Sequence, residues 1–393
     1  MNASLLDRLR SELDARGATG GLRRDLVVSG PQGPTIGMDG ATLVNLAAND
    51  YLGLAGDPEV LESARRALRD MGLGVSAGRV LGGSREIHGE LEAGIAELVG
   101  AEDALIYTSC FDANLGVFDA LLDREDVVLS DALNHASLID GMRLAPARRH
   151  VFAHADLEDL ERLLAGSAGA RNRVIVTDGV FSMDGEIAAL PRLRELALRY
   201  DAALMVDDSH ATGVLGATGA GTAERYGLQG GVDVLTGTLG KALGAAGGFV
   251  AGDRAVVETL RQVSRPYVFT NAMAPPLAAA ALTAIRIVRE RPELRERLAT
   301  NTAWLRAALR DLGYDVLPGE HPIIPVMLPR GTAARDVAAA VRRDGVLAFA
   351  LSHPVVPAGE ERIRVQVSAA HTTEQLELAV AAFARARAVL AGS

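Results

Sequence analysis

Short apolar runs alternate with helical patterns through the middle of the chain. The runs are rich in β-branched and aliphatic residues and span residues 104–107, 126–130, 173–177, 203–206, 232–236 and 248–251. Patterns of helical period, such as residues 157–164 and 190–200, fall between them. This alternation predicts repeated βα units, and runs that are apolar throughout predict strands buried on both faces of a mainly parallel sheet. The ends of such strands are where ligands bind.

The last hundred residues follow a different pattern. Two long helical tracts, 278–291 and 293–312, lead into predicted strands at 321–328 and 362–368 and predicted helices at 333–343 and 373–390. This order is typical of an α+β unit. We therefore predict an N-terminal arm over residues 1–45, a large α/β domain over 46–280 and a smaller α+β C-terminal domain over 281–393.

The last predicted strand alternates strictly between polar and apolar residues. Arg362, Arg364, Gln366 and Ser368 share one face, so we expect a half-buried strand. Arginines on such a face most often form surface salt bridges. The alternative is a bidentate guanidinium clamp on the carboxylate of a substrate.

Composition narrows the class of protein. The 49% of hydrophobic and 23% of charged residues exclude a disordered chain, and 50 acidic against 40 basic side chains give a net charge of −10. That charge argues against a nucleic-acid or anionic-membrane binder. Residues 1–17 lack the order of a signal peptide, and the most apolar stretch, 273–285, is too short to cross a bilayer. With a single cysteine, Cys110, no intrachain disulfide is possible, and we expect a cytoplasmic protein.

A glycine-rich segment after the run 232–236 contains the first candidate for chemistry. Residues 236–248 read TGTLGKALGAAGG, with Lys241 among glycines. A phosphate-binding P-loop is excluded, because Leu235 and Ala242 stand where its first glycine and its hydroxyl residue are required. A surface lysine on a turn is the plain alternative. A lysine confined in this way can instead stay near neutrality and form a Schiff base.

Polar residues also follow the run 203–206, in the sequence Asp207-Asp-Ser-His210. One of the two carboxylates, Asp207 or Asp208, is expected to cap the following turn. A buried carboxylate can also keep the ring nitrogen of a pyridoxal cofactor protonated, which makes that ring an electron sink. Asp207 then supplies the charge and Lys241 the covalent link.

Two further strand ends carry small polar residues. Ser109, Cys110 and Phe111 stand where a strand runs into a helix start, a place that favours a phosphate but also suits a plain helix cap. Thr238 offers a second hydroxyl. His135 follows the strand 127–129 and could lie flat over a cofactor ring, although a lone histidine is more often structural. A metal site is disfavoured, because His150 and His154 lack a third ligand cluster.

Taken together, the motifs resemble those of the α-oxoamine synthases. They are, in unbroken order, 49–53 (NDYLG), 109–114 (SCFDAN), 131–137 (DALNHAS), 178–185 (DGVFSMDG), 206–210 (VDDSH) and 236–244. These enzymes use pyridoxal 5'-phosphate, have the aspartate-aminotransferase-like fold (fold type I) and join an amino acid to an acyl-CoA. The resemblance covers the chain from about residue 20 to its end.

The resemblance implies a role for each candidate. Lys241 is the lysine that bonds the cofactor and later removes the α-proton, and Asp207 pairs with the ring nitrogen. His135 stacks on the ring, and His210 and Ser182 lie beside its hydroxyl. The remaining ligands are Ser109, Cys110, Phe111 and Thr238 at the phosphate, Thr270 from the partner subunit of a homodimer, and Asn49 and Arg364 at the substrate carboxylate.

Within the family, residues 109–114, 131–137, 323–328 and 354–357 are most similar to the glycine C-acetyltransferases, whose substrates are glycine and acetyl-CoA. Residues 74–84 and 350–353 depart from that pattern. An 8-amino-7-oxononanoate synthase, or another family member with a different acyl donor or amino acid, is the alternative. A third hypothesis is a non-catalytic protein that keeps the fold. Such a protein would normally lose the lysine or the aspartate, but both Lys241 and Asp207 are present.

Overall fold

A seven-stranded sheet forms the centre of the computed structural model, which describes residues 3–18, 22, 25–353 and 355–391. Its strand order is β3-β9-β8-β7-β6-β4-β5. All neighbours are parallel except at β9, which runs antiparallel to β3 and to β8. The strands are Asp103–Tyr107 (β3), Val127–Asp131 (β4), Arg148–Phe152 (β5), Arg173–Asp178 (β6), Ala203–Asp207 (β7), Val234–Thr238 (β8) and Gly248–Gly252 (β9). The mainly parallel sheet is thus confirmed.

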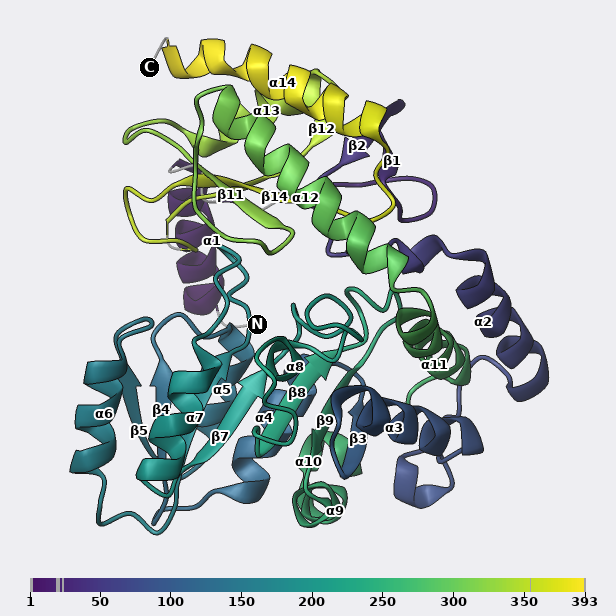
Figure 1. Ribbon diagram of the computed structural model, residues 1–393, viewed down its shortest axis with the longest axis vertical. Helices are drawn as coiled ribbons and strands as arrows, with labels where there is room; N and C mark the ends of the chain where they lie inside the picture. The colour runs from purple at the N-terminus through teal and green to yellow at the C-terminus, as the bar shows by residue number, and fades with distance from the viewer. Residues whose placement is uncertain (1–2, 19–21, 23–24, 354, 392–393) are drawn as a thin grey trace.

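Helices cover both faces of this sheet (Figure 1). Neighbouring residues of β4 point to opposite sides: Val128 packs with α4, α5 and α9, whereas Val127 and Leu129 pack with α6 and α7. Both layers exclude water, which explains why the strands are apolar throughout. The helices of this part are Pro58–Met71 (α2), Glu86–Val99 (α3), Cys110–Leu121 (α4), Ala136–Leu144 (α5), Leu157–Gly166 (α6), Leu190–Arg199 (α7), Thr222–Arg225 (α8), Arg254–Val263 (α9), Arg265–Val268 (α10) and Pro275–Glu290 (α11), with 3-10 turns at Leu54–Gly56 (η1) and Arg79–Leu81 (η2).

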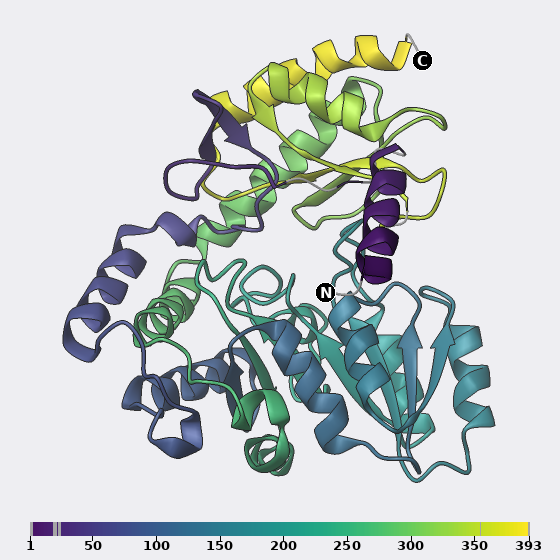
Figure 2. The same cartoon turned by 180° about the vertical axis from the view of Figure 1, so that it is seen from behind.

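A second, smaller unit lies beyond the carboxyl ends of the parallel strands (Figures 1 and 2). Its four-stranded sheet has the order β10-β11-β14-β13, and helix α12 connects it to the large sheet domain. Its elements are Glu293–Asp311 (α12), Asp315–Val316 (β10), Ile323–Met327 (β11), Ala334–Arg343 (α13), Val346–Leu347 (β12), Phe349–Leu351 (β13), Arg362–Gln366 (β14) and Thr373–Ala391 (α14).

Both ends of the chain contribute to this smaller unit. Helix α1 (Ala3–Ala18) stands at its side in Figure 2, and strands β1 (Thr35–Met38) and β2 (Ala41–Asn45) form a hairpin. Strand β2 pairs in parallel with β12, so residues of the expected N-terminal arm join the C-terminal part in one sheet. The boundary expected at residue 280 falls inside α11, which packs against α2 and α3.

The expectation of a half-buried strand at the end of the chain was wrong. Both faces of β14 are buried, including Arg362 at 3% and Gln366 at 1% exposure. The polar face is covered because Gln366 donates from Nε2 to the carbonyl of Ala47 and Ser368 donates from Oγ to that of Asp50. The alternation therefore marks a face turned toward other polar groups of the protein.

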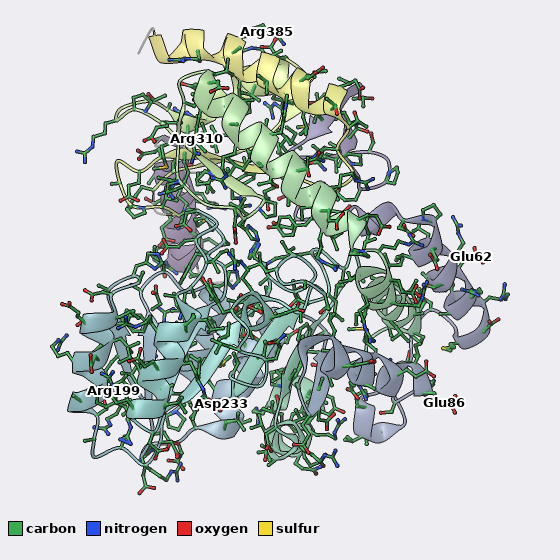
Figure 3. All side chains as sticks on the ribbon, viewed as in Figure 1. Glu62, Glu86, Arg199, Asp233, Arg310 and Arg385 are labelled. Carbon is green, nitrogen blue, oxygen red and sulfur yellow. The ribbon has the colours of Figure 1, made fainter. Side chains whose placement is uncertain are left out.

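Charged side chains are spread over both units, as Arg199, Asp233, Arg310 and Arg385 illustrate in Figure 3. Many of them pair locally; Arg199, for example, contacts Glu161 and Glu195 at 2.6 and 2.8 Å. None of the described helices combines the length and apolar character that a membrane span requires.

Candidate active site

A pocket of about 240 Å³ lies at the carboxyl ends of the parallel strands β6, β7 and β8. The strand register brings Asp178 of β6 level with Asp207 of β7, and Asp207 level with Thr236 of β8. The pocket is lined by Ser109, Cys110, Phe111, His135, Ser137, Asp178, Val180, Ser182, Asp207, Ser209, His210, Thr238 and Lys241. Most of the candidates expected from the sequence thus lie together.

Asp207 ends β7 and Lys241 follows the end of the neighbouring strand β8, and both line this pocket. Asp207 is 4% exposed, and its carboxylate accepts hydrogen bonds from Asn114 Nδ2 at 2.7 Å and from the backbone N–H of Ser209 at 2.9 Å. Burial lowers the pKa of Lys241, although the negative charge of Asp207 opposes that shift. A larger fraction of the Lys241 amine is therefore neutral than in an exposed lysine.

The N-terminus of α4 forms one wall. Ser109 caps the helix by accepting from the N–H of Asp112 at 3.0 Å. Ser109, Cys110 and Phe111 all line the pocket, so the first turn of α4 starts at its wall. Gly248 at the start of β9 makes this possible, because a Cβ there would overlap the backbone of Cys110. Thr238 lies on the same wall. A helix N-terminus with a hydroxyl beside it is a suitable anion site.

His135 caps helix α5, and the Nδ1 edge of its ring faces Ser137. Its Nδ1 lies 2.8 Å from Ser137 Oγ and 3.3 Å from the N–H of Ser137. Burial lowers the pKa of His135, so the ring is neutral near pH 7.

His210 is held by residues of both units. The Nδ1 of His210 lies 2.8 Å from the hydroxyl of Tyr51, and that hydroxyl also donates to Gln366 Oε1 at 3.1 Å. The backbone carbonyl of His210 lies 2.9 Å from His321 Nε2. Burial lowers the pKa of His210 well below its usual value. Asn49 is linked to this group only loosely, with 3.5 Å between its Oδ1 and the Tyr51 hydroxyl.

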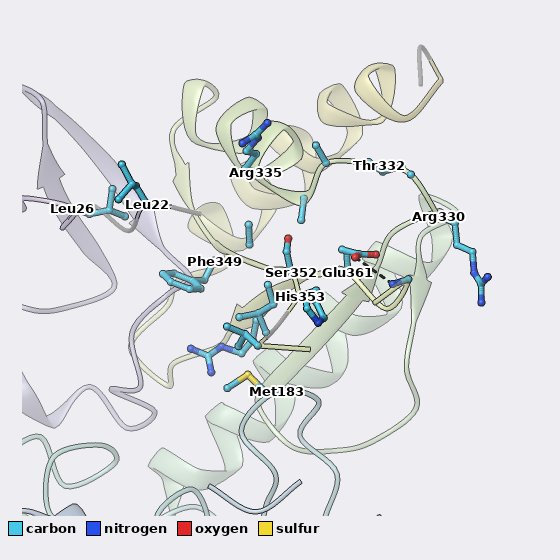
Figure 4. Close-up of a pocket in the computed structure, with 18 of the residues that line it drawn as sticks. Leu22, Leu26, Met183, Arg330, Thr332, Arg335, Phe349, Ser352, His353 and Glu361 are labelled. Atoms are coloured by element: carbon cyan, nitrogen blue, oxygen red, sulfur yellow. Dashed lines mark hydrogen bonds between the residues drawn. The ribbon is translucent and has the colours of Figure 1, made fainter. Parts of the chain in front are cut away.

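Arg364 of β14 does not line this pocket but contacts one of its residues, Ser182. Its Nη1 donates to the carbonyl of Ser182 at 2.9 Å, whereas its buried Nε has no partner among the described residues. Arg364 also lines a second, larger cavity of about 1120 Å³, into which Met183 projects from the large domain and Phe349 from the smaller unit (Figure 4). The two cavities thus adjoin at Arg364 and the residues Ser182 and Met183.

Thr270 is not among the residues that line the pocket of its own chain. It lies beside Tyr107 and Thr108 in a separate small pocket. From the resemblance we expected Thr270 to act in the site of a partner subunit. The single chain does not test that expectation, which stays a prediction.

Sequence reasoning missed several residues of the site, among them Asn114, Ser137 and Asp178. Asn114 and Ser137 form hydrogen bonds beneath the pocket, and Asp178 is buried with an Oδ1 that has no partner among the described residues. Burial and the nearby Asp207 raise the pKa of Asp178 well above its usual range. Its place at the end of an apolar run was a usable signal, since strand ends carry ligands.

The donor set fits a phosphorylated pyridine aldehyde. A confined lysine, a buried carboxylate and a helix N-terminus meet in one pocket, and Asp178 in its wall keeps a buried Oδ1 without a partner among the described residues. Such a pocket has a site for covalent attachment, one for a protonated ring nitrogen and one for a phosphate.

Comparison with known proteins agrees with this geometry. The family model "Aminotransferase class I and II" matches residues 41–383. The chain is 44% identical over 389 residues to the 2-amino-3-ketobutyrate coenzyme A ligase of Escherichia coli strain K12, covering 98% of both chains. It is 46% identical over 385 residues to the 8-amino-7-oxononanoate synthase of Anaeromyxobacter sp. strain K, covering 98% of this chain and 96% of the relative.

Among solved structures, a serine palmitoyltransferase from S. paucimobilis with a bound PLP–myriocin complex superposes with a TM-score of 0.91 at 30% identity, covering 99% of each chain. The expected aspartate-aminotransferase-like fold is thus confirmed. The chain therefore belongs to the class I and II aminotransferase family and, within it, to the α-oxoamine synthases that its motifs resemble.

Proposed function

We propose that this protein is a pyridoxal-phosphate-dependent acyltransferase that joins glycine to acetyl-CoA, giving 2-amino-3-ketobutyrate and CoA, or catalyses the reverse cleavage. The observation that carries the proposal is the presence of Lys241 and the buried Asp207 in the wall of one pocket. Identity of 44% to a 2-amino-3-ketobutyrate coenzyme A ligase over 98% of the chain supports the choice of substrates. The expected setting is the cytoplasm, in keeping with the single cysteine.

The residues of the pocket would hold the cofactor at three points. Lys241 would bond its aldehyde, Asp207 would hold its ring nitrogen, and the first turn of α4 with Thr238 would hold its phosphate. His210 and Ser182 would stand beside its hydroxyl. When bound, the cofactor supplies a protonated ring that accepts the electrons of a carbanion at the substrate α-carbon.

Lys241 is suited to remove the α-proton. Its Nζ must be neutral to accept a proton, and burial lowers its pKa in that direction. Asn49 and Arg364 would orient the glycine carboxylate, since the Nη1 of Arg364 already lies beside the pocket, where it donates to the carbonyl of Ser182. His135 would stack on the ring and donate a hydrogen bond to the thioester oxygen as negative charge develops there.

The larger cavity beside Arg364 suits the acyl donor. Arg364 in its wall donates to the carbonyl of Ser182 in the smaller pocket, so a thioester there can approach the amino acid. Its apolar residues, Phe349, Leu351 and Val355 among them, can cover an apolar chain, and Arg330 and Arg335 on the small-domain side carry positive charge (Figure 4).

A homodimer is part of the proposal. Large apolar side chains are exposed on two neighbouring segments: Leu73, Val80 and Leu81 at 76, 59 and 78%, and Phe269 at 76%. The segments are joined by the pairing of Gly78 with Asn271. Apolar surface of this kind indicates an interface, and Thr270 next to Phe269 would enter the partner's site.

An 8-amino-7-oxononanoate synthase is the second candidate. The 46% identity to such an enzyme favours it, and so does a cavity far larger than an acetyl group needs. Initial rates with acetyl-, succinyl-, pimeloyl- and palmitoyl-CoA, each paired with glycine, alanine and serine, separate the candidates. We expect acetyl-CoA with glycine to be among the best pairs. The acetyltransferase proposal fails if pimeloyl-CoA with alanine gives the dominant rate.

The Lys241→Ala variant is the control for the panel, and it also tests the non-catalytic alternative. It should still take up pyridoxal phosphate without a covalent bond, and turnover should be lost. Borohydride should bleach the yellow wild-type protein and fix the label on Lys241. A colourless wild-type protein, or turnover in the variant, contradicts the proposal.

A further inference from the structure

A chain of hydrogen bonds links Asp207 to His135. It runs through Asn114 and Ser137, to which the proposed function gives no part in attaching the cofactor or in binding its phosphate. Asn114 Nδ2 donates to Asp207 Oδ2 at 2.7 Å and to Ser137 Oγ at 2.8 Å, and Ser137 Oγ lies 2.8 Å from His135 Nδ1. Asn114 and Ser137 are 0 and 1% exposed. Water therefore does not compete for these contacts, and each donor and acceptor must be matched within the protein.

The orientation of the Asn114 amide is set by the charge at one end of the chain. An amide oxygen placed 2.7 Å from a carboxylate oxygen would be repelled, so the nitrogen must face Asp207. Both amide hydrogens are then used, one on Asp207 and one on Ser137. The amide oxygen of Asn114, Oδ1, is buried and has no partner among the described residues.

The orientation of Asn114 leaves the hydroxyl proton of Ser137 available to His135. Because Ser137 Oγ accepts from Asn114, its own hydrogen is free to donate to His135 Nδ1. The backbone N–H of Ser137 also points at Nδ1, at 3.3 Å, and a backbone N–H can only donate. The backbone contact therefore requires Nδ1 to be an acceptor and the hydroxyl contact is consistent with it, so the neutral ring carries its proton on Nε2.

We propose that Asn114 and Ser137 are positioning residues that hold His135 as the neutral tautomer with its proton on Nε2, and that the Asp207 carboxylate sets this tautomer through them. His135 thus presents a hydrogen-bond donor, not an acceptor, on the ring edge opposite Ser137. This inference rests on the proposed function, in which the thioester oxygen needs such a donor.

The tautomer can be measured directly in the protein loaded with pyridoxal phosphate. Histidines labelled with nitrogen-15 give separate signals for protonated and unprotonated ring nitrogens, and His135→Gln identifies the signals of His135. We expect an unprotonated Nδ1 and a protonated Nε2 in the wild type. Ser137→Ala should reduce the separation, because only the longer backbone contact at 3.3 Å remains, and Ser137→Thr, which keeps the hydroxyl, should restore it. Asn114→Ala should weaken it.

Kinetics give a second readout. Removing one hydrogen bond of this kind should lower kcat about five- to tenfold in Ser137→Ala with little change in KM for glycine, and Ser137→Thr should recover it. Ser63→Ala is the matched control, since Ser63 is a buried serine that donates to the carbonyl of Val60 away from the site.

Two results would overturn the inference: a proton on Nδ1 of His135 in the wild type, or a Ser137→Ala protein whose histidine signals and kcat match the wild type. If His135 shows the expected tautomer but the acyl-CoA panel finds no activity with glycine, the proposed function fails and the positioning role remains.

Discussion

Two adjacent carboxylates at the end of β7 have different roles. Asp207 faces the pocket, whereas Asp208 turns the other way and accepts from the N–H and hydroxyl of Thr222, at the start of α8. Burial raises the pKa of Asp208 to about 6. The sequence predicted that one of the pair would cap the following turn, and Asp207 does so at the N–H of Ser209 while it also faces the pocket. The strand's pleat, which sends neighbours to opposite faces, turns Asp208 away.

A histidine outside the pocket makes stability depend on pH. His154 Nδ1 lies 2.9 Å from the buried Asp131, and its Nε2 lies 3.4 Å from Glu186. Hydrogen bonds to these two carboxylates raise the pKa of His154 to about 10. Because this value exceeds the unfolded pKa near 6.5, the stabilisation is complete below about pH 6.5, declines as the pH rises and is lost above about pH 10.

His154→Gln should therefore lower the free energy of unfolding by about 2 kcal/mol at pH 6 and by almost nothing at pH 10.5. Urea titrations of the two proteins at both pH values measure the difference. His150→Gln is the control, since the ring of His150 forms no ion pair among the described residues. An equal loss at both pH values would show that His154 acts through packing against Phe181 alone.

At the scale of elements, the strand ends explain why the site was predictable. Strands buried on both faces are continuous apolar runs in the sequence, so their ends, and the polar residues after them, can be located. Strand β5 was missed because it lies at the sheet edge, where Arg148, Arg149 and Val151 are exposed. The polar face of β14 was misjudged, because its partners at residues 47 and 50 come from the other end of the chain.

The close approach of β9 to α4 should be intolerant of any side chain. In Gly248→Ala the new methyl group would overlap the backbone of Ser109 and Cys110, and backbone cannot rotate away. We expect a loss of about 3 kcal/mol in unfolding free energy and weaker binding of pyridoxal phosphate, since the first turn of α4 must move.

Gly89→Ala is the control for this variant. Gly89 lies inside α3 with open space where its Cβ would be, so the substitution should stabilise the helix by about 0.5–1 kcal/mol. Thermal unfolding together with cofactor titration by absorbance distinguishes the two. A Gly248→Ala protein that binds cofactor like the wild type would contradict the assignment of the phosphate to this helix end.

At the scale of the whole molecule, the sequence predicted the parts better than their connections. Strand β2 near residue 45 pairs with β12 near residue 346, and Tyr51 meets Gln366, contacts between segments some three hundred residues apart. A single sequence contains periodicity but no information on such distant pairing. The site therefore includes partners, such as Gln366 behind His210, that no local motif could indicate.

From the exposed apolar segments around Leu81 and Phe269 we predict a homodimer with shared active sites, which can be tested with mixed subunits. If Thr270 completes the site of the partner subunit, a heterodimer of one Lys241→Ala chain and one Thr270→Ala chain contains one fully wild-type site and one doubly altered site. Co-expressed with two affinity tags and assayed at limiting cofactor, it should regain about half the wild-type rate, although each homodimer is impaired. If Thr270 acts within its own chain, every site of the heterodimer carries a defect and no rate is regained. Thr259→Ala in place of Thr270→Ala is the matched control, because Thr259 is an exposed threonine that donates to the carbonyl of Ala255, and this pair should reach half the wild-type rate in either case.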